Sequence, residues 1–400
     1  MSVTEQEILR QAEENAAYAG ELRRWFHRHP ELAREEFLTQ QKIEEELDKI
    51  GLSHARAAGT GVYAEIRGCG EKNGPERTIL LRADTDALPV EEQSDAPYKS
   101  EIPGKMHACG HDAHTASLIC AAKILAANRN RFSGTVRLVF QPGEEIGYGG
   151  RVIVQEGLVD GADRTFGIHL ASELPCGSIA LVPGANNASC DWFKITVKGL
   201  GAHVSTPEKG VDALYIASQI VVSSQALLTR RISPMDNLLI GFGKLTAGTA
   251  YNCVADLAEI EGTTRAFSPE LRRQANEELE ALAKATAAMF GGSAEVQWRD
   301  NASPLINDPQ SCEEAQKVAV SLFGEENVIK ARTPALGADD MADFINRVPG
   351  CYGYVGSSNP DFPNSCVAHH NDHFDIDEKC LITASAMYAA YAIDFLNGKV

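Results

Sequence analysis

The sequence lacks any hydrophobic run long enough to cross a bilayer, which predicts a protein without a membrane partner. Residues 1–20 are polar, acidic and helical in pattern, unlike a secretory signal. The 10 cysteines are widely and irregularly spaced, and no Cys-x-x-Cys pair occurs among them. In a long chain without a signal, such spacing indicates reduced thiols rather than a disulfide framework. We therefore expect a cytoplasmic protein.

Positive charge is in short supply. The chain has 37 Lys and Arg against 55 Asp and Glu, which gives a formal net charge of −18 at pH 7. A surface that binds nucleic acid needs a surplus of Lys and Arg to neutralise phosphates. The acidic balance therefore predicts no nucleic-acid partner, and it is too common among enzymes to identify a substrate.

Several catalytic signatures are also missing. The chain has no Gly-x-Ser-x-Gly turn, so a serine hydrolase would lack its nucleophile. It has neither a Walker loop nor a Gly-x-Gly-x-x-Gly turn, so nucleotide and dinucleotide chemistry lack support. The chemistry has to be sought in other residue types.

The hydrophobic pattern indicates an α/β protein. At 400 residues, with 44% apolar and 23% charged residues, the chain is an ordinary globular protein with room for two domains. Short strand-like runs alternate with helices, which predicts a mostly parallel sheet covered by helices on both faces. The helices are expected at 4–28, 39–50, 112–127 and 378–396, and the strands at 61–66, 78–84, 135–140 and 165–170.

A different pattern occupies the middle of the chain. After about residue 185 the order becomes β-α-β-β-α-β, that of a ferredoxin-like α+β unit, and the α/β pattern resumes from about residue 300. We therefore predict an inserted domain at 187–298 within a larger, metal-binding domain made of 1–186 and 299–400. The inserted elements are expected at 191–198, 211–229, 237–246, 253–267, 269–289 and 294–298.

The segment 106–114, MHACGHDAH, concentrates side chains that bind metals. Thiol sulfur beside imidazole nitrogen is the donor set of zinc and its first-row neighbours. Cys109 and His111 lie just before a predicted helix, whose N-terminus would favour the thiolate. Taken alone, the two residues are explained equally well as a small buried thiol and a helix start.

Further donors follow predicted strands of the same domain. Neighbouring side chains on extended backbone point in opposite directions, so one carboxylate of an acidic pair can bind a metal while the other faces the water that it activates. Each cluster alone also fits an acidic turn, a core histidine or a polar surface loop. Their convergence predicts a metal-dependent hydrolase, and a Cys109 nucleophile with His111 as its base would leave the acidic pair without a role. These donors are Glu144-Glu145, His169 and His369-His370.

The motifs, in this order, resemble those of the aminoacylase and carboxypeptidase family of dinuclear metallopeptidases (peptidase family M20), in its amidohydrolase branch. That branch includes hippurate hydrolases and hydrolases of auxin conjugates. The resemblance covers essentially the whole chain, and MHACGHD followed by HFDIDE is its most specific part. The matching segments are FHRHPELAREE near the start, RADTDALP at 82–89, MHACGHDAHTA at 106–116, QPGEE at 141–145, GAHVSTPEKGVDA at 201–213, GTTRAF at 262–267 and HHNDHFDIDE at 369–378.

The resemblance implies a zinc-exopeptidase-like domain with a ferredoxin-like lid that also mediates dimerisation. It implies two divalent metal ions (Zn, or Mn, Co or Ni) that hold a bridging hydroxide, with Glu144 as the general base. Asp86 would orient a ligand, and His203 would stabilise the oxyanion, often from the partner subunit. Asn252 and Arg265 align with positions that hold the substrate carboxylate or acyl oxygen, although a strand surface charge explains Arg265 equally well. The implied metal ligands are Cys109, His111, Glu145, His169 and His370.

The expected reaction is the hydrolysis of N-acyl-L-amino acids, small molecules with an acetyl, benzoyl or similar aromatic acyl group, by a homodimer or larger homo-oligomer. The chain departs from the family pattern at 252–255 (Asn-Cys-Val-Ala) and at 338–341 (Ala-Asp-Asp-Met), so the acyl preference stays open. A dipeptidase or aminopeptidase on the same metals is a second hypothesis. A binding protein with a structural zinc is a third, although such sites close with four ligands and leave no carboxylate over.

Overall fold

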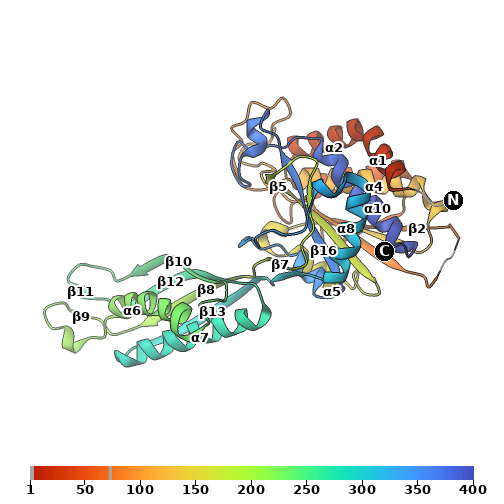
Figure 1. Cartoon of the computed structure of the whole chain (residues 1–400). Helices are drawn as coiled ribbons and strands as arrows, with labels where there is room; N and C mark the ends of the chain where they lie inside the picture. Colours follow the sequence, from red (N-terminus) through yellow and green to blue (C-terminus); the bar gives the residue numbers. More distant parts are fainter. Residues whose placement is uncertain (1–3, 72–73) are drawn as a thin grey trace. The chain divides into compact units, whose positions relative to one another are not determined.

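The computed structural model describes residues 4–71 and 74–400, and it divides the chain into two compact units (Figure 1). The first unit comprises the described residues up to Asn186 together with Asn307–Thr333 and Asp339–Val400. The second unit comprises Asn187–Ile306 and Pro334–Ala338. Within the described ranges, no helix is both long and apolar enough to span a membrane.

An eight-stranded sheet forms the centre of the first unit. Its strands, in chain order, are β1 (His54–Ala57), β2 (Gly61–Arg67), β3 (Thr78–Asp84), β4 (Thr135–Gln141), β5 (Arg164–Pro175), β6 (Ile179–Ala180), β15 (Val328–Ile329) and β16 (Gly350–Ser358). In space the order is β1-β2-β4-β3-β5-β16-β6-β15. The central strands β4, β3, β5 and β16 are parallel, whereas β1 and β2 are antiparallel additions. The predicted mostly parallel sheet is confirmed.

Helices flank this sheet (Figure 1), and two of them are almost entirely buried. These are α4 (His111–Ala127) and α10 (Cys380–Leu396), which pack against each other. Tyr388 and Tyr391 of α10 contact the Phe166 ring of β5 at centroid distances of 5.7 and 5.1 Å. Helices that are apolar on all sides are typical of such enclosed positions. Further helices of the unit are α1 (Glu5–Glu14), α2 (Ala16–Arg28), α3 (Phe37–Ile50), α5 (Gly149–Gln155), α8 (Pro309–Phe323) and α9 (Met341–Ile345).

The N-terminal helix is interrupted, and the single helix expected at 4–28 was wrong. Asn15 separates α1 from α2, with φ −96° and ψ 6°, and its side chain donates to the Gln11 carbonyl at 2.8 Å. Asparagine competes with regular helix bonding through local bonds of this kind. By contrast, Gly51 ends α3 in the left-handed conformation (φ 79°), a common cap at the end of a helix.

The second unit is a four-stranded antiparallel sheet with two helices, in the predicted β-α-β-β-α-β order. Its elements are β8 (Cys190–Lys198), α6 (Ala213–Ala226), β10 (Leu238–Ala247), β12 (Leu257–Ala266), α7 (Pro269–Met289) and β13 (Ser293–Ala302), and the sheet order is β10-β12-β8-β13. Alternate residues of β8, namely Phe193, Ile195 and Val197, are fully buried. The strand expected at 253–267 is two strands, because β11 (Cys253–Val254) pairs separately with β9 (Ala202–His203).

Candidate metal centre

The carboxyl ends of parallel strands deliver the candidate donors to one place, as is usual in α/β sheets. β5 carries His169, the turn after β4 carries Glu144 and Glu145, and α4 begins at His111. Gly110, just before this helix, has φ 89°, and a Cβ there would meet the Leu170 side chain at 3.2 Å. A glycine is therefore required between the two donors of this segment.

The Cys109 thiol lies at the centre of the group. Nε2 of His169 is 3.5 Å from its sulfur. One donor atom each of Cys109, His111 and Glu145 lie within 4.8 Å of one another. The Glu145 carboxylate is 3.9 Å from Nε2 of His111 and 3.5 Å from Nε2 of His370. The structure thus brings together all five residues expected as metal ligands, from segments far apart in the sequence.

Two of the imidazoles direct Nε2 toward the other donors. Nδ1 of His111 donates to the Asp86 carbonyl at 2.9 Å, and Nδ1 of His169 donates to the Leu170 carbonyl at 2.7 Å. A carbonyl oxygen can only accept, so Nδ1 of each ring carries a proton, and Nε2 is the atom left to bind a metal, as in histidines that bind metals. Burial, with His114 adding to it, lowers the pKa of His169 well below its ordinary value, which keeps this ring neutral.

Two donor atoms of the centre have no hydrogen-bond partner within residues 4–71 and 74–400, and its carboxylates are crowded. Nε2 of His111 and Oε1 of Glu145 are buried and, among the described residues, have no hydrogen-bond partner. Burial, followed by the nearby Asp339 and Glu145 carboxylates, raises the pKa of Glu144 well above its ordinary value. Buried polar atoms without partners and crowded carboxylates are both costly. Divalent cations would relieve both costs, so the donor set fits metal ions.

Asp86 holds the acidic pair through the backbone. Its two carboxylate oxygens accept the N–H groups of Glu144 and Glu145, each at 3.0 Å. One of these oxygens also lies 3.3 Å from Nδ1 of His111. Because consecutive amides are held by one carboxylate, Asp86 orients the segment that carries both glutamates.

Sequence reasoning missed a second layer of buried charge behind the donors. Asp84 lies 2.6 Å from Nδ1 of His114, and Nε2 of His114 accepts the Leu170 N–H at 2.9 Å. The fully buried Arg82 bonds Asp84 at 2.6 Å and Asp340 at 2.8 Å. The sequence offers two aspartates in RADTD and two histidines in HDAH, but it does not indicate which of these side chains pair with each other.

The departure from the family pattern at 338–341 lies against the candidate base. Glu144, Asp339 and Asp340 each place a carboxylate oxygen within 4.8 Å of the others. Arg82 is 3.5 Å from Asp339, and Gln141 donates to Asp340 at 2.7 Å. Asp339 and Asp340 therefore belong to the electrostatic surroundings of Glu144.

Three expected residues belong to the second unit. β9, which ends at His203, pairs with β11, which follows Asn252, so these two residues are neighbours. Ser205 N–H donates to Nδ1 of the exposed His203 ring at 3.1 Å, which leaves Nε2 as the N–H donor. Arg265 lies half-buried on β12.

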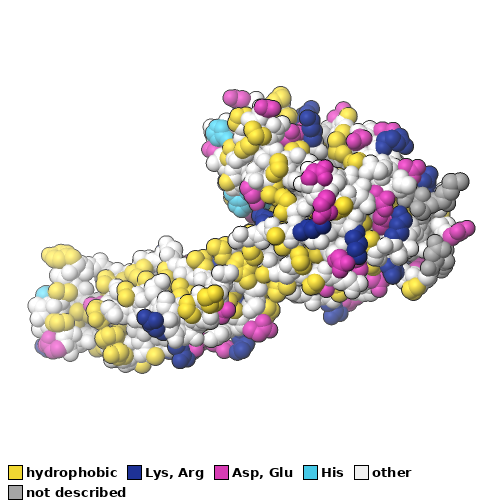
Figure 2. Space-filling view, viewed as in Figure 1, with side chains coloured by type: hydrophobic (Ala, Val, Ile, Leu, Met, Phe, Trp, Pro, Cys, Tyr) yellow, Lys and Arg dark blue, Asp and Glu magenta, His cyan; other side chains and the backbone are white. Residues whose placement is uncertain are grey.

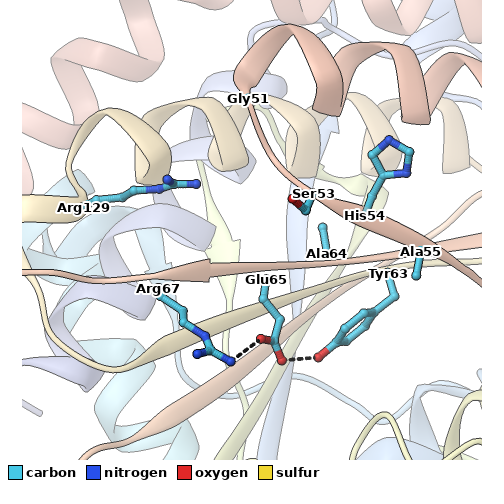
Figure 3. A pocket seen from close by; sticks show the side chains of 9 residues that line it. All are labelled: Gly51, Ser53, His54, Ala55, Tyr63, Ala64, Glu65, Arg67 and Arg129. Carbon is cyan, nitrogen blue, oxygen red and sulfur yellow. Dashed lines mark hydrogen bonds and ion pairs between the residues drawn. The ribbon is translucent and has the colours of Figure 1, made fainter.

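A separate hollow of about 470 Å³ lies beside β1 and β2 in the first unit (Figure 3). Within it, Glu65 accepts from Tyr63 at 2.6 Å and from Arg67 at 3.4 Å. The residues that line it are Gly51, Ser53, His54, Ala55, Tyr63, Ala64, Glu65, Arg67 and Arg129. None of these is a candidate donor, so the hollow is distinct from the metal centre.

Comparison with known proteins gives consistent matches over the whole chain. Residues 80–394 match the family described as Peptidase family M20/M25/M40. N-acetylcysteine deacetylase of Bacillus subtilis is 37% identical over 378 residues, which cover 94% of this chain and 96% of that protein. IAA-amino acid hydrolase ILR1-like 4 of Arabidopsis thaliana is 33% identical over 380 residues, which cover 94% of this chain and 85% of that protein.

A solved structure with the same fold is that of the Bacillus subtilis YXEP protein, described as a dinuclear metal binding peptidase from the M20 family. It has a TM-score of 0.83 and 32% sequence identity, and the match covers 96% of this chain and 99% of that one. The likeness thus includes both the sheet that carries the candidate donors and the second unit.

Proposed function

The chain belongs to peptidase family M20/M25/M40 and is a metal-dependent amidohydrolase, and from this premise we propose that its substrates are N-acyl-L-amino acids. The acyl group in this proposal is acetyl, benzoyl or a similar aromatic group, released as a carboxylic acid beside the free amino acid. Two relatives support the class, since one is named a deacetylase of N-acetylcysteine and another a hydrolase of IAA-amino acids.

We assign the binding of two divalent ions to the five converging donors. The observation that carries the proposal is this convergence, with Nε2 of His111 and Oε1 of Glu145 buried and lacking hydrogen-bond partners in the described part of the chain. When bound, such ions supply Lewis acidity and lower the pKa of water. Thiolate and imidazole suit zinc, and the carboxylate also admits manganese, cobalt or nickel. The donors are Cys109, His111, Glu145, His169 and His370.

Glu144 is left over from the ligand set, and we assign it the transfer of a proton. Its carboxylate lies beside the donors, 4.0 Å from Nε2 of His111. As a carboxylate it takes a proton from the attacking water while the new C–O bond forms. It then gives this proton to the amide nitrogen as the C–N bond breaks. The Asp86 carboxylate keeps Glu144 in place because it accepts the backbone N–H of Glu144.

We assign the remaining contacts with the substrate to residues of the second unit. His203 has Nε2–H free to donate, which supports a role in stabilising the oxyanion, from the same chain or from a partner. The planar fork of Arg265 suits a substrate carboxylate, and Asn252, the neighbour of His203, suits the acyl oxygen.

The test replaces the Glu144 carboxylate, the proton acceptor, with an amide of the same size. We expect Glu144→Gln to lower hydrolysis at least about 100-fold, the usual contribution of a general base, while both ions stay bound. Activity is measured on acetyl, benzoyl, indole-acetyl and aminobenzoyl amino acids with added Zn, Mn, Co or Ni, and bound metal by elemental analysis. Glu313→Gln, at an exposed position of α8, serves as the control. A Glu144→Gln enzyme that keeps most of its activity would remove Glu144 from the mechanism.

A dipeptidase or aminopeptidase on the same centre is the alternative, supported by the description of the YXEP protein as a peptidase. Dipeptides with a free amine are added to the same panel. Faster turnover of these than of every N-acyl amino acid would replace the proposed substrate class.

We also propose a cytoplasmic location and a homo-oligomer that forms through the second unit. The cysteines in the structure are free thiols, which supports a reducing compartment.

A further inference from the structure

His369 is not among the ligand positions that the family resemblance implies, yet its ring lies at the candidate centre. One donor atom each of Cys109, His169 and His369 lie within 4.8 Å of one another. The His169 and His369 ring centroids are 5.1 Å apart. The adjacent His370 faces Glu145 at 3.5 Å, whereas the His369 ring lies beside the His169 ring.

The hydrogen bonding of His369 repeats the arrangement of the implied ligands. Its Nδ1 donates to the Cys109 carbonyl at 3.2 Å. Because a carbonyl only accepts, Nε2 carries the lone pair, and this atom is buried with no hydrogen-bond partner among the described residues. His111 and His169 likewise donate from Nδ1 to a backbone carbonyl. Such a bond fixes the tautomer and the ring orientation of a histidine that binds metal.

The local backbone holds His369 in this position. His370 has φ 66°, a conformation that non-glycine residues rarely adopt, and its N–H donates to the Ala108 carbonyl at 2.7 Å. The fully buried Phe374 ring packs against the His369 ring at 4.6 Å. The segment is therefore anchored to the loop that carries Cys109, and His369 is not part of a free surface loop.

We propose that Nε2 of His369 is an additional metal ligand, on the side of the centre formed by Cys109 and His169. The inference rests on the proposed dinuclear centre and adds one nitrogen donor to it. An extra imidazole strengthens the preference for zinc, cobalt or nickel over manganese, because nitrogen donors suit those ions.

The test measures metal binding rather than turnover. Metal-free wild type, His369→Leu and His369→Asn are titrated with Co²⁺, and the visible absorption and the stoichiometry are recorded; Zn²⁺ affinity is measured against a chromophoric chelator. Leucine removes the whole imidazole, whereas the asparagine amide can still donate to the Cys109 carbonyl. His373→Leu, an exposed position on the same segment, is the control.

We expect both His369 variants to bind one of the two ions at least about 10-fold more weakly, the lower end of what outer-shell changes alone cost. We also expect a changed cobalt spectrum in both, and wild-type behaviour in His373→Leu. Wild-type affinity and spectrum in both variants would overturn the proposal. Weakening in His369→Leu alone would also overturn it, since the backbone hydrogen bond would then be the cause. A wild-type protein that binds neither ion would instead refute the proposed function itself.

Discussion

Glu36 shows how burial near the centre sets the charge of a single side chain. Its carboxylate accepts the Gly143 N–H at 2.9 Å and the Thr60 hydroxyl, close behind the turn that carries the acidic pair. Burial raises the pKa of Glu36 to about 7, and the charge of Asp86 adds to the effect. The folded chain therefore holds a proton on this group over a pH range in which the unfolded chain has lost it.

The first prediction concerns the pH dependence of stability. Because the folded pKa of Glu36 exceeds the ordinary value of 4.5, its contribution is fully present below pH 4.5 and is lost as the pH rises through 7. Glu36→Gln should remove this dependence, so the free energy of unfolding of wild type should fall relative to the variant by up to about 3 kcal/mol between pH 4.5 and 7.5. Urea denaturation of metal-free protein measures it. Glu35→Gln, exposed next to it, should run parallel to wild type, and a parallel Glu36→Gln curve would contradict the assignment.

The Arg23 side chain joins elements that carry candidate ligands. From α2, the fully buried guanidinium bonds Asp112 in the first turn of α4 at 2.9 Å and Asp375, after the His370 segment, at 2.7 Å. His27, one turn further along α2, bonds the same Asp112 at 2.7 Å. Helix α2 thus aligns two segments that are far apart in the sequence.

Arg23→Met is expected to lower the free energy of unfolding by about 3–5 kcal/mol, because it leaves two buried carboxylates without their cation. Arg24→Met is the matched control. Arg24 is half-exposed and paired with Glu378 at 2.6 Å, so its loss should cost less than about 1 kcal/mol. Denaturant unfolding of both variants compares them directly. Equal effects would show that the Arg23 network does not hold the elements together.

Elements with a long, regular pattern were predictable from the sequence. The helix at 269–289 and the buried strands β3 and β4 lie where the periodicity placed them, because a strong pattern and clear end signals agree there. At the break, the Asn15 side chain bonds the Gln11 carbonyl, a local feature that periodicity does not register. The strands β6 and β15 have two residues each, too few to carry any period.

The residues of the candidate centre also fall into two groups, those that the sequence identifies and those that it does not. Donors such as Cys109 and His169 stand out by residue type and motif order. Behind them, Asp84 and Arg82 are buried partners whose pairing depends on tertiary packing. Single-sequence reasoning has no signal for such pairs, since a charged residue in a sequence is more often solvated. The sequence presents His369 as one half of a polar pair, and it carries no sign of the tautomer that the Cys109 carbonyl imposes.

Metal removal tests the whole first unit. Its core includes two helices that are buried along nearly their whole length, α4 and α10, so we expect folding to survive without the ions. A chelator should abolish amide hydrolysis and leave the far-UV circular dichroism unchanged. The melting temperature should fall only because bound ions no longer stabilise the folded state. Added Zn, Mn, Co or Ni should restore turnover. A chain that unfolds on chelation would favour a structural zinc in a binding protein instead.

Exposed hydrophobic side chains of the second unit form the surface through which we propose that copies of the chain associate. Figure 2 shows hydrophobic side chains spread over the visible face of this unit. On α6, Leu214 and Val222 are 47% and 67% exposed and, eight residues apart, share one side of the helix. Strand β10 pairs with β12 alone among the described strands, so its other edge is open. Patches and edges of this kind are typically covered by a partner.

We therefore expect a dimer in sedimentation velocity for wild type and a monomer for the double variant Leu214→Glu with Val222→Glu, because buried carboxylates without partners oppose association. Phe37→Glu makes the same change at a 65% exposed position of the first unit and should leave the dimer intact. A monomeric wild type, or a double variant that still dimerises, would exclude this interface. The monomeric variant also shows which chain supplies His203 to the substrate. If its kcat falls while both ions stay bound, the partner supplies His203. If its kcat is unchanged, the His203 ring acts within its own chain.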